Sequence, residues 1–314
     1  MIAENAAPGA KRVVGIGELL WDLLPSGAQL GGAVSNCAVI AGLMGEDAVC
    51  ASRVGADDLG GRARARLSSM PLDLSCLQTD ASHPTGTVSV AFEAGQPKYE
   101  IHAPAAWDFL ELTEQWGALA EHADAICFGT LAQRAPVSAK TIAGFLDRSS
   151  PRCVRVFDVN LRAPFYSVEV VERSLQRATI LKMNDAEVPE ILRLLGIESA
   201  EAGSLDASLL HGARILLRNF PIRLVSITIG AHGSLLVTPR ESDRHPGVQT
   251  RVADTVGAGD AFTAALVYGY LRDAPLAALN ESANRWGAWV ASQPGAMPAG
   301  PPPWAQPSLS AGLR

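Results

Sequence analysis

Short apolar runs typical of β-strands alternate with helix-like apolar patterns along most of this chain, and that alternation limits the folds it can adopt. Strand-like runs lie at residues 12–17, 48–54, 125–129, 154–159, 179–182 and 223–229. Helix-like patterns lie at residues 34–44, 59–69, 137–146, 170–176, 186–195, 258–271 and 276–292. Such a succession favours parallel strands with helices on both faces of the sheet. The sequence therefore predicts an α/β domain with a doubly wound, mostly parallel sheet.

Two stretches interrupt the alternation. Residues 19–30 follow the first strand without a helix, and residues 86–92 and 98–102 are typical of a hairpin. We predict a small second sheet, inserted at about residues 19–31 and 84–106 and placed to act as a lid over a ligand. An edge extension of the main sheet is the alternative. An exposed lid edge could also pair with a second copy of the chain, which would give a homodimer.

Composition and charge limit the setting in which the chain works. A length of 314 residues with 48% hydrophobic content suffices for one large domain, assigned to residues 12–300, with tails at residues 1–11 and at the proline-rich residues 301–314. The net charge of −6 gives no general basic field, so we expect neither nucleic acid nor a membrane as partner. Five scattered cysteines without a C-x-x-C pair, and no signal-peptide pattern, predict reduced thiols in a cytoplasmic protein.

A glycine-rich turn, D-T-V-G-A-G-D-A-F at residues 254–262, runs directly into an apolar helix pattern. Free N–H groups at a helix start bind anions, and the glycines let a phosphate approach Gly257, Ala258 and Gly259 closely. A carboxylate repels phosphate, so Asp260 in the same turn suggests a proton acceptor beside the phosphate. This combination points to phosphoryl transfer. The alternative is a small-residue helix start whose acidic residue favours the helix dipole.

A second glycine-opened helix follows Gly31 and Gly32. The glycine pair permits close approach of a polar ligand, and Asn36 offers a donor and acceptors to hydroxyl groups, which suits a sugar. Asp22, just after the first strand, could accept further hydroxyls, whereas Trp21 is expected in the core.

Other motifs for nucleotides and metals are missing from the sequence. It contains no G-x-x-x-x-G-K-[ST] loop, and residues 15–18 supply only part of a dinucleotide fingerprint and lead away from a helix. No cysteine or histidine cluster has metal-ligand spacing, so we expect any divalent ion to arrive with a nucleotide.

The chain resembles the ribokinase, or phosphofructokinase-B, family of carbohydrate kinases over about residues 12–300. The family's Gly-Gly…Asn-x-Ala element is matched by Gly31, Gly32, Asn36 and Ala38, and its D-T-x-G-A-G-D-A-F element is matched throughout residues 254–262. The resemblance implies an enzyme that uses ATP, in which Asp260 is the general base. It also implies that Gly257, Ala258 and Gly259 form the anion hole for the transferring phosphoryl group.

The resemblance extends to cation sites. Asn184 and Glu187 match the family's N-x-x-E, which organises Mg²⁺ and its waters, while a helix cap and its capping partner are the alternative for this pair. Asp254, Val256 and Gly295 fall where many relatives bind a monovalent cation such as K⁺, so a K⁺ site is a second implication.

The sequence motifs expected to contact the nucleotide are less specific. Thr228, Gly230 and Gly233 resemble the family's T-x-G-x-x-G, a contact to nucleotide phosphate and ribose, although an ordinary hairpin turn has the same pattern. Asn284 falls where family members contact the adenine side.

Fructokinase-like members share the D-x-N-x-R pattern of Asp158, Asn160 and Arg162. If the chain stays extended, the three polar side chains lie on one face. Arg162 could then contact sugar or phosphate, with a structural salt bridge to Asp158 as the alternative, and Gln133 could contact a hydroxyl.

Fructose or a related ketose is therefore the expected substrate. Val34 and Ser35 depart from the residues that usually follow the glycine pair in the family, which leaves the identity of the sugar open. A nucleoside or other small-alcohol kinase, and a non-catalytic sugar-binding protein, remain the alternatives.

Overall fold

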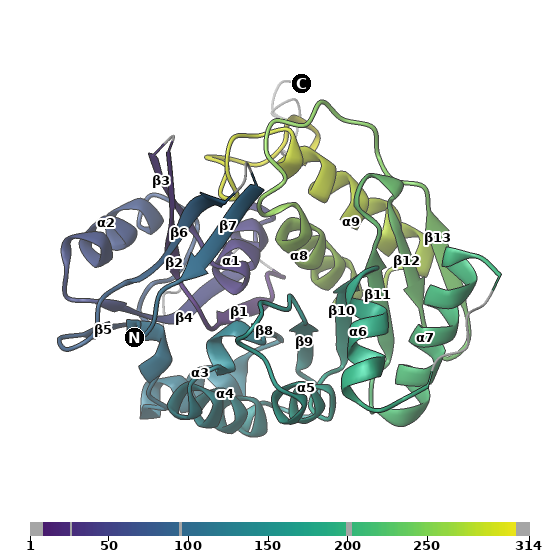
Figure 1. The fold of residues 1–314 in the computed structure, drawn as a ribbon, viewed down its shortest axis with the longest axis horizontal. Coiled ribbons are helices and arrows are strands. Elements are labelled where there is room, and N and C mark those ends of the chain that lie inside the picture. The colour runs from purple at the N-terminus through teal and green to yellow at the C-terminus, as the bar shows by residue number, and fades with distance from the viewer. Residues whose placement is uncertain (1–8, 26, 94–95, 199–202, 306–314) are drawn as a thin grey trace, which may run out of the picture.

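The computed structural model describes residues 9–25, 27–93, 96–198 and 203–305 (Figure 1). Most of residues 1–11 and 301–314, which the sequence assigns to tails, lie outside this range. The described part contains one nine-stranded sheet and one four-stranded sheet. No helix in these ranges combines the length and apolar character needed to cross a membrane.

The main sheet has the order β13-β12-β11-β10-β9-β8-β1-β4-β5. Its strands are β1 Arg12–Ile16, β4 Asp47–Gly55, β5 Leu77–Asp80, β8 Ala125–Gly129, β9 Val154–Asp158, β10 Ile180–Asn184, β11 Leu224–Thr228, β12 Ser234–Val237 and β13 Ser242–His245. The pairings from β5 to β11 are parallel, and only β12 and β13 add antiparallel partners. The predicted doubly wound, mostly parallel sheet is confirmed.

Helices cover both faces of this sheet (Figure 1). They are α1 Ala33–Leu43, α2 Asp58–Leu67, α3 Glu114–His122, α4 Pro136–Arg148, α5 Val168–Leu175, α6 Glu187–Leu194, α7 Leu205–Asn219, α8 Ala258–Tyr270 and α9 Leu276–Ala291. Short 3₁₀ turns lie at Ala106–Phe109, Leu131–Gln133, Gly230–His232 and Pro303–Ala305.

The two faces of the main sheet have separate hydrophobic cores, because successive residues of a strand point to opposite faces. Val13 packs with α1, α8 and α9, whereas its neighbour Val14 packs in the core that α3 to α7 cover. The helices α1 and α8 therefore share one layer, which brings their two glycine-opened starts into the same part of the molecule.

The second sheet has the order β3-β2-β6-β7, formed by β2 Leu20–Leu24, β3 Gly27–Gly31, β6 Gly86–Glu93 and β7 Gln96–Ile101. It is separate from the main sheet, so the alternative of an edge extension is wrong. Trp21 is buried with Leu19 and Leu30 in a third core cluster and donates from Nε1 to the Leu59 carbonyl. The expectation of a core role for Trp21 is confirmed.

Some elements were not predicted from the sequence. They include α3, α7, β5 and the β12–β13 hairpin. Helix α7 buries Leu209, Ala213 and Leu216, a helical spacing that is present in the sequence but broken by polar residues. All five cysteines are buried and unpaired as disulfides, as predicted.

Candidate active site

Helix α8 begins at a glycine that no other residue could replace without strain. Gly257 is the N-cap with a left-handed φ of +79°, and a Cβ there would lie 2.5 Å from the Cβ of Ala296. No side chain caps the helix. The Ala258 N–H contacts the Thr255 carbonyl at 3.3 Å, but no described residue accepts from the Gly257 or Gly259 N–H. This helix start can therefore receive an anion.

The predicted base lies in the first turn of this helix. Asp260 is bonded to the other glycine-opened helix, because Asn36 donates from Nδ2 to its Oδ2 at 2.7 Å. Asn36 is 2% exposed, and its Oδ1 has no hydrogen-bond partner among the described residues. The structure thus joins the two motifs, 224 residues apart in sequence. The amide donor expected to meet a sugar hydroxyl instead holds the carboxylate.

The pKa of Asp260 is raised from 3.8 to about 6, chiefly by burial and next by the charge of Asp158. Lys182, the Asn36 hydrogen bond and Arg162 act in the opposite direction. A carboxylate whose pKa approaches neutrality accepts a proton more readily than an ordinary surface aspartate, yet it is largely ionised at pH 7. The site therefore contains a carboxylate suited to general base catalysis.

Lys182 was not assigned a role from the sequence, although it lies in the same segment as Asn184. It lies in the middle of β10, and its buried ammonium is 3.1 Å from the Asp158 carboxylate. A Cβ on Gly259 would lie 3.1 Å from Lys182 Nζ, so the cation adjoins the open end of α8. Burial lowers the pKa of Lys182, but Asp158, Asp260 and Glu187 together raise it above the usual value. The ammonium therefore stays charged beside the anion site.

Thr263 completes this cluster from the next turn of α8. Its Oγ1 lies 3.2 Å from Asp158 Oδ2 and 2.9 Å from the Gly259 carbonyl oxygen. Asp158 therefore bonds Lys182 and Thr263 rather than Arg162, and the alternative of an Asp158–Arg162 salt bridge is wrong.

Glu18 is a second buried carboxyl that sequence reasoning missed. It is 3% exposed, and its Oε1 accepts the N–H of Ala33, the first residue of α1, at 3.2 Å. Its Oε2 has no partner among the described residues. The pKa of Glu18 is raised from 4.5 to about 7, chiefly by burial and in smaller part by the charge of Asp260. The signal in the sequence was a glutamate directly after an apolar strand and before Leu19.

Asn184 and Glu187 bond each other's backbone. Asn184 N–H donates to Glu187 Oε2 at 2.8 Å, and Glu187 N–H donates to Asn184 Oδ1 at 2.9 Å. Glu187 Oε1 accepts the Leu161 N–H at 2.8 Å. This is the capping arrangement named above as the alternative, and it fixes both side chains at the carboxyl end of β10.

The D-x-N-x-R segment does not stay extended. Strand β9 ends at Asp158, and Asn160 has a left-handed φ of +41°. The prediction of one shared face is therefore wrong, because the positive φ rotates the following residues away from the strand direction. Arg162 still contributes to the site, since its charge lowers the pKa of Asp260 and of Asp22.

Gln133 lies in the interior. It is 4% exposed, and its Nε2 donates to the Gly129 carbonyl and to Ser174 Oγ. The structure does not bring this amide to the residues around Asp260.

Asp22 lies on the four-stranded sheet beside the glycine pair. A Cβ on Gly31 would lie 3.0 Å from Asp22 Oδ2, and a Cβ on Gly32 would lie 2.4 Å from the Glu18 carbonyl oxygen. The pKa of Asp22 is raised to about 6, because burial and the charge of Asp254 outweigh the opposite effect of Arg162. The second sheet and the α8 turn thus contribute neighbouring charges.

Thr228, which is expected beside the nucleotide, pairs with Asn184 at the carboxyl ends of β11 and β10 in the main sheet. Thr228 ends β11, and Gly230 and Gly233 form the turn into β12 with φ of +52° and +85°. Asp254 Oδ1 accepts the Val256 N–H at 3.0 Å, and Gly295 has a φ of +73°.

Asn284 is buried on α9. Its Nδ2 donates to Ser234 Oγ at 2.7 Å and to the Asn280 carbonyl at 2.8 Å. These bonds fix α9 against β12, and the amide is 7% exposed.

Comparison with known proteins identifies the class. The pfkB family carbohydrate kinase model matches residues 27–303, so the chain belongs to that family and is a carbohydrate kinase. The chain is 27% identical to a putative sugar kinase, PH1459, of Pyrococcus horikoshii, over 83% of each chain. It is also 27% identical to a fructokinase of Escherichia coli, over 91% of this chain and 95% of that protein.

Solved structures support the same fold. The ATP complex of PH1459 has a TM-score of 0.77 and 26% identity, covering 92% of this chain and 95% of that one. A fructokinase of Vibrio cholerae with fructose, ADP and calcium bound has a TM-score of 0.76 and 25% identity, covering 94% and 97%. The ribokinase-like fold expected from the sequence is confirmed.

Proposed function

We propose that this kinase transfers the γ-phosphoryl group of ATP to a primary hydroxyl of fructose or a related ketose. The observation that carries the proposal is the 2.7 Å hydrogen bond from Asn36 to Asp260, which joins α1 and α8, the helices that we assign to the sugar and to the phosphate. ATP is the donor suggested by the ATP-bound PH1459 structure, and fructose is suggested by the fructokinase relatives.

In this mechanism Asp260 takes the proton from the attacking hydroxyl as the oxygen approaches the γ-phosphorus. The free N–H groups of Gly257 and Gly259 and the ammonium of Lys182 stabilise negative charge on the transferring group. Because these groups are held by the fold, they need little rearrangement during the reaction. One such preorganised donor is worth about 2.7–4 kcal/mol of barrier in a well-studied case.

Mg²⁺ fits the donor set through water. Both Glu187 oxygens already accept backbone N–H groups, so Asn184 and Glu187 would hold the ion's waters rather than the ion itself. When bound, Mg²⁺ neutralises charge on the β- and γ-phosphates. We place the adenosine beside Thr228, Gly230 and Gly233, with Asn284 behind them.

The four-stranded sheet would act as a lid. It carries Asp22, and its β3 strand ends at Gly31, so sugar bound beside the glycine pair would lie under it. Closure would exclude water that competes with the sugar as phosphoryl acceptor. Its edge strands β3 and β7 would be the surface through which two copies form a homodimer. Separately, Asp254, Val256 and Gly295 would form the site for K⁺.

A substrate panel tests the proposal. Purified protein with ATP and Mg²⁺ would be assayed on fructose, ribose, 2-keto-3-deoxygluconate, adenosine and inosine, with and without K⁺. Fructose should give the highest kcat/KM. A clear preference for a nucleoside would replace the sugar assignment while keeping the kinase. Sugar binding without turnover on any substrate would favour a non-catalytic sugar-binding protein.

A further inference from the structure

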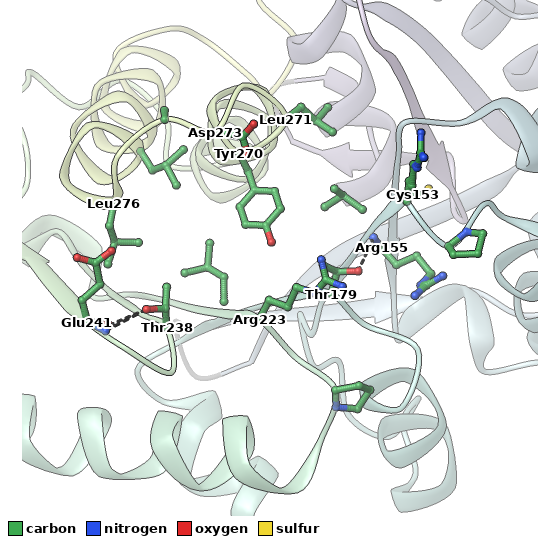
Figure 2. A pocket seen from close by; sticks show the side chains of 17 residues that line it. Cys153, Arg155, Thr179, Arg223, Thr238, Glu241, Tyr270, Leu271, Asp273 and Leu276 are labelled. Atoms are coloured by element: carbon green, nitrogen blue, oxygen red, sulfur yellow. Dashed lines mark hydrogen bonds between the residues drawn. The ribbon is translucent and has the colours of Figure 1, made fainter.

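A cavity of about 590 Å³ lies opposite the active site, at the starts of β9 and β11 (Figure 2). Its two exposed arginines, Arg152 and Arg223, are balanced by two exposed carboxylates in the same lining, Glu241 and Asp273. The guanidinium of a third arginine, Arg155, is hydrogen-bonded outside the cavity. The lining therefore gives no preference for a charged ligand.

Arg134 differs from these arginines because its guanidinium is buried. Its side chain is 6% exposed, and its Nε and Nη2 donate to the two carboxylate oxygens of Asp108 at 2.8 Å each. Its Cζ also lies 3.8 Å from the ring centroid of Trp107. The third nitrogen, Nη1, is buried without a partner among the described residues. A buried ion pair adds little net stability, but a planar fork on a carboxylate fixes the guanidinium in one position.

This guanidinium holds one end of the four-stranded sheet. Its Nη2 donates to the His102 carbonyl at 2.8 Å, and His102 directly follows β7. The His102 N–H donates to the Thr87 carbonyl of β6 at 3.0 Å, so His102 continues the pairing of the two strands. Trp107 packs against the first residue of β6, since a Cβ on Gly86 would lie 2.2 Å from its Nε1. Arg134 and Trp107 together therefore fix this end of the sheet.

The same guanidinium contacts the loop that carries Arg162. Its Cζ lies 4.9 Å from the ring centroid of Phe165. The Phe165 N–H donates to the Arg162 carbonyl at 2.7 Å, so the ring and Arg162 belong to one tight turn. The charge of Arg162 lies near Asp22 and Asp260, because it lowers the pKa of both. One buried side chain thus connects the four-stranded sheet with the cation beside these two carboxylates.

We propose that Arg134 is a positioning residue for sugar binding, which places Arg162 according to the position of the four-stranded sheet. The inference rests on the proposed function, in which this sheet closes over the sugar and Arg162 contacts it. Packed interiors transmit small displacements, so a movement of His102 on closure would reach the turn at Arg162 through the guanidinium. Arg134 acts through Arg162 and not by contacting the sugar itself.

Arg134→Lys tests the proposal, because lysine keeps a charge for Asp108 but loses the fork and the planar face. KM for the best acceptor of the substrate panel should rise about tenfold, while kcat and KM for ATP stay near their wild-type values. Arg177→Lys is the matched control. Arg177 forms the same two-pronged pair with Asp147, at 2.8 and 2.9 Å, just before β10 and away from both segments. This control should leave all three constants unchanged.

A double-mutant cycle with Arg162→Ala separates positioning from a general loss of packing. Arg162→Ala alone should raise the same KM, and Arg134→Lys should then add less than about twofold. Equal effects of Arg134→Lys in both backgrounds would overturn the proposal, as would an unchanged KM in either folded single variant. Phe165→Leu keeps the pair with Asp108 and should raise the KM about threefold, so it tests the same link if Arg134→Lys unfolds.

Hydrogen exchange on the full chain needs no ligand and so distinguishes this proposal from the proposed function. The Phe165 amide should exchange about fivefold faster in Arg134→Lys and at the wild-type rate in Arg177→Lys. Unchanged exchange at Phe165 in Arg134→Lys would overturn the positioning role whichever substrate the panel identifies. A panel without turnover would overturn the proposed function and leave the exchange result to decide the role of Arg134.

Discussion

Helices α1 and α8 both begin after a glycine with positive φ, yet their N-termini meet different groups. At α1, after Gly32, the first N–H donates to the buried carboxyl of Glu18. At α8, after Gly257, no side chain caps the helix, and the ammonium of Lys182 adjoins Gly259. Equivalent helix starts thus differ in whether an internal carboxyl group occupies them.

This difference assigns different roles to the two helices. A carboxyl at the start of α1 leaves little reason for a phosphate to bind there, and the helix instead supplies Asn36 as a fixed donor to Asp260. The open start of α8 beside Lys182 keeps a place for an external anion. The same local motif is therefore a support in one helix and a binding site in the other.

The largest expected effect comes from removing the base at the start of α8. Asp260→Asn keeps the shape but cannot accept the proton, so kcat should fall about 10³-fold, within the range for general base catalysis. Steady-state kinetics measures the loss, and titration with an ATP analogue should show nearly unchanged nucleotide binding. Near-normal turnover would remove Asp260 from the role of base.

Removing the cation at α8 should have the next largest effect. Lys182→Met deletes the ammonium beside Gly259, and kcat should fall about 10²-fold, comparable to the loss of one preorganised donor. The exposed Lys140→Met on α4 is the control and should be silent. Thermal unfolding must be followed in parallel, because Asp158 loses its buried partner and stability will fall. Unchanged kcat in a folded variant would mean that the start of α8, like that of α1, has no cation that takes part in catalysis.

Breaking the link between the helices should have a smaller effect. Asn36→Ala removes a hydrogen bond that lowers the pKa of Asp260, so the acid limb of the kcat/KM profile should move to higher pH. At pH 7 we expect about a tenfold loss, as a greater fraction of Asp260 is protonated and its orientation is less fixed. Asn219→Ala on α7 is a remote control. An acid limb that stays in place would argue that α1 does not support the base.

The smallest effect on turnover should follow Glu18→Gln, which keeps an acceptor for the Ala33 N–H. Burial raises the pKa of Glu18 to about 7 in the folded protein, above 4.5. The folded state therefore binds the proton more tightly, and stability contributed by protonated Glu18 is lost as pH rises from about 4.5 through 7.

Unfolding temperature measured from pH 5 to pH 8 should accordingly decline less in Glu18→Gln than in wild type. The exposed Glu121→Gln is the control and should follow the wild-type curve. Parallel curves for wild type and Glu18→Gln would show that Glu18 is not held protonated at the start of α1.

The parallel sheet and the starts of two helices could be predicted from the sequence because they depend on local chemistry. Apolar periodicity predicted the parallel sheet, and the two glycine motifs predicted that helices would begin near Gly32 and Gly257. Lys182 and Glu18 escaped prediction because one stands within an apolar strand and the other just after one, where nothing local indicates a partner. The expectation of an extended D-x-N-x-R segment was wrong for a related reason, since the positive φ of Asn160 is set by distant packing, as is the burial of Gln133.

The sequence by itself determined the α/β architecture and the family of carbohydrate kinases, since these follow from periodicity and short motifs, whereas the structure decided that the second sheet is separate. Only the tertiary structure decided that Asn36 bonds Asp260, that Lys182 adjoins Gly259 and that Glu18 occupies the start of α1. Those contacts join residues far apart in the chain, and the pKa shifts depend on burial that no single segment produces. The difference between the two helix starts is therefore a property of packing, although both begin with a glycine.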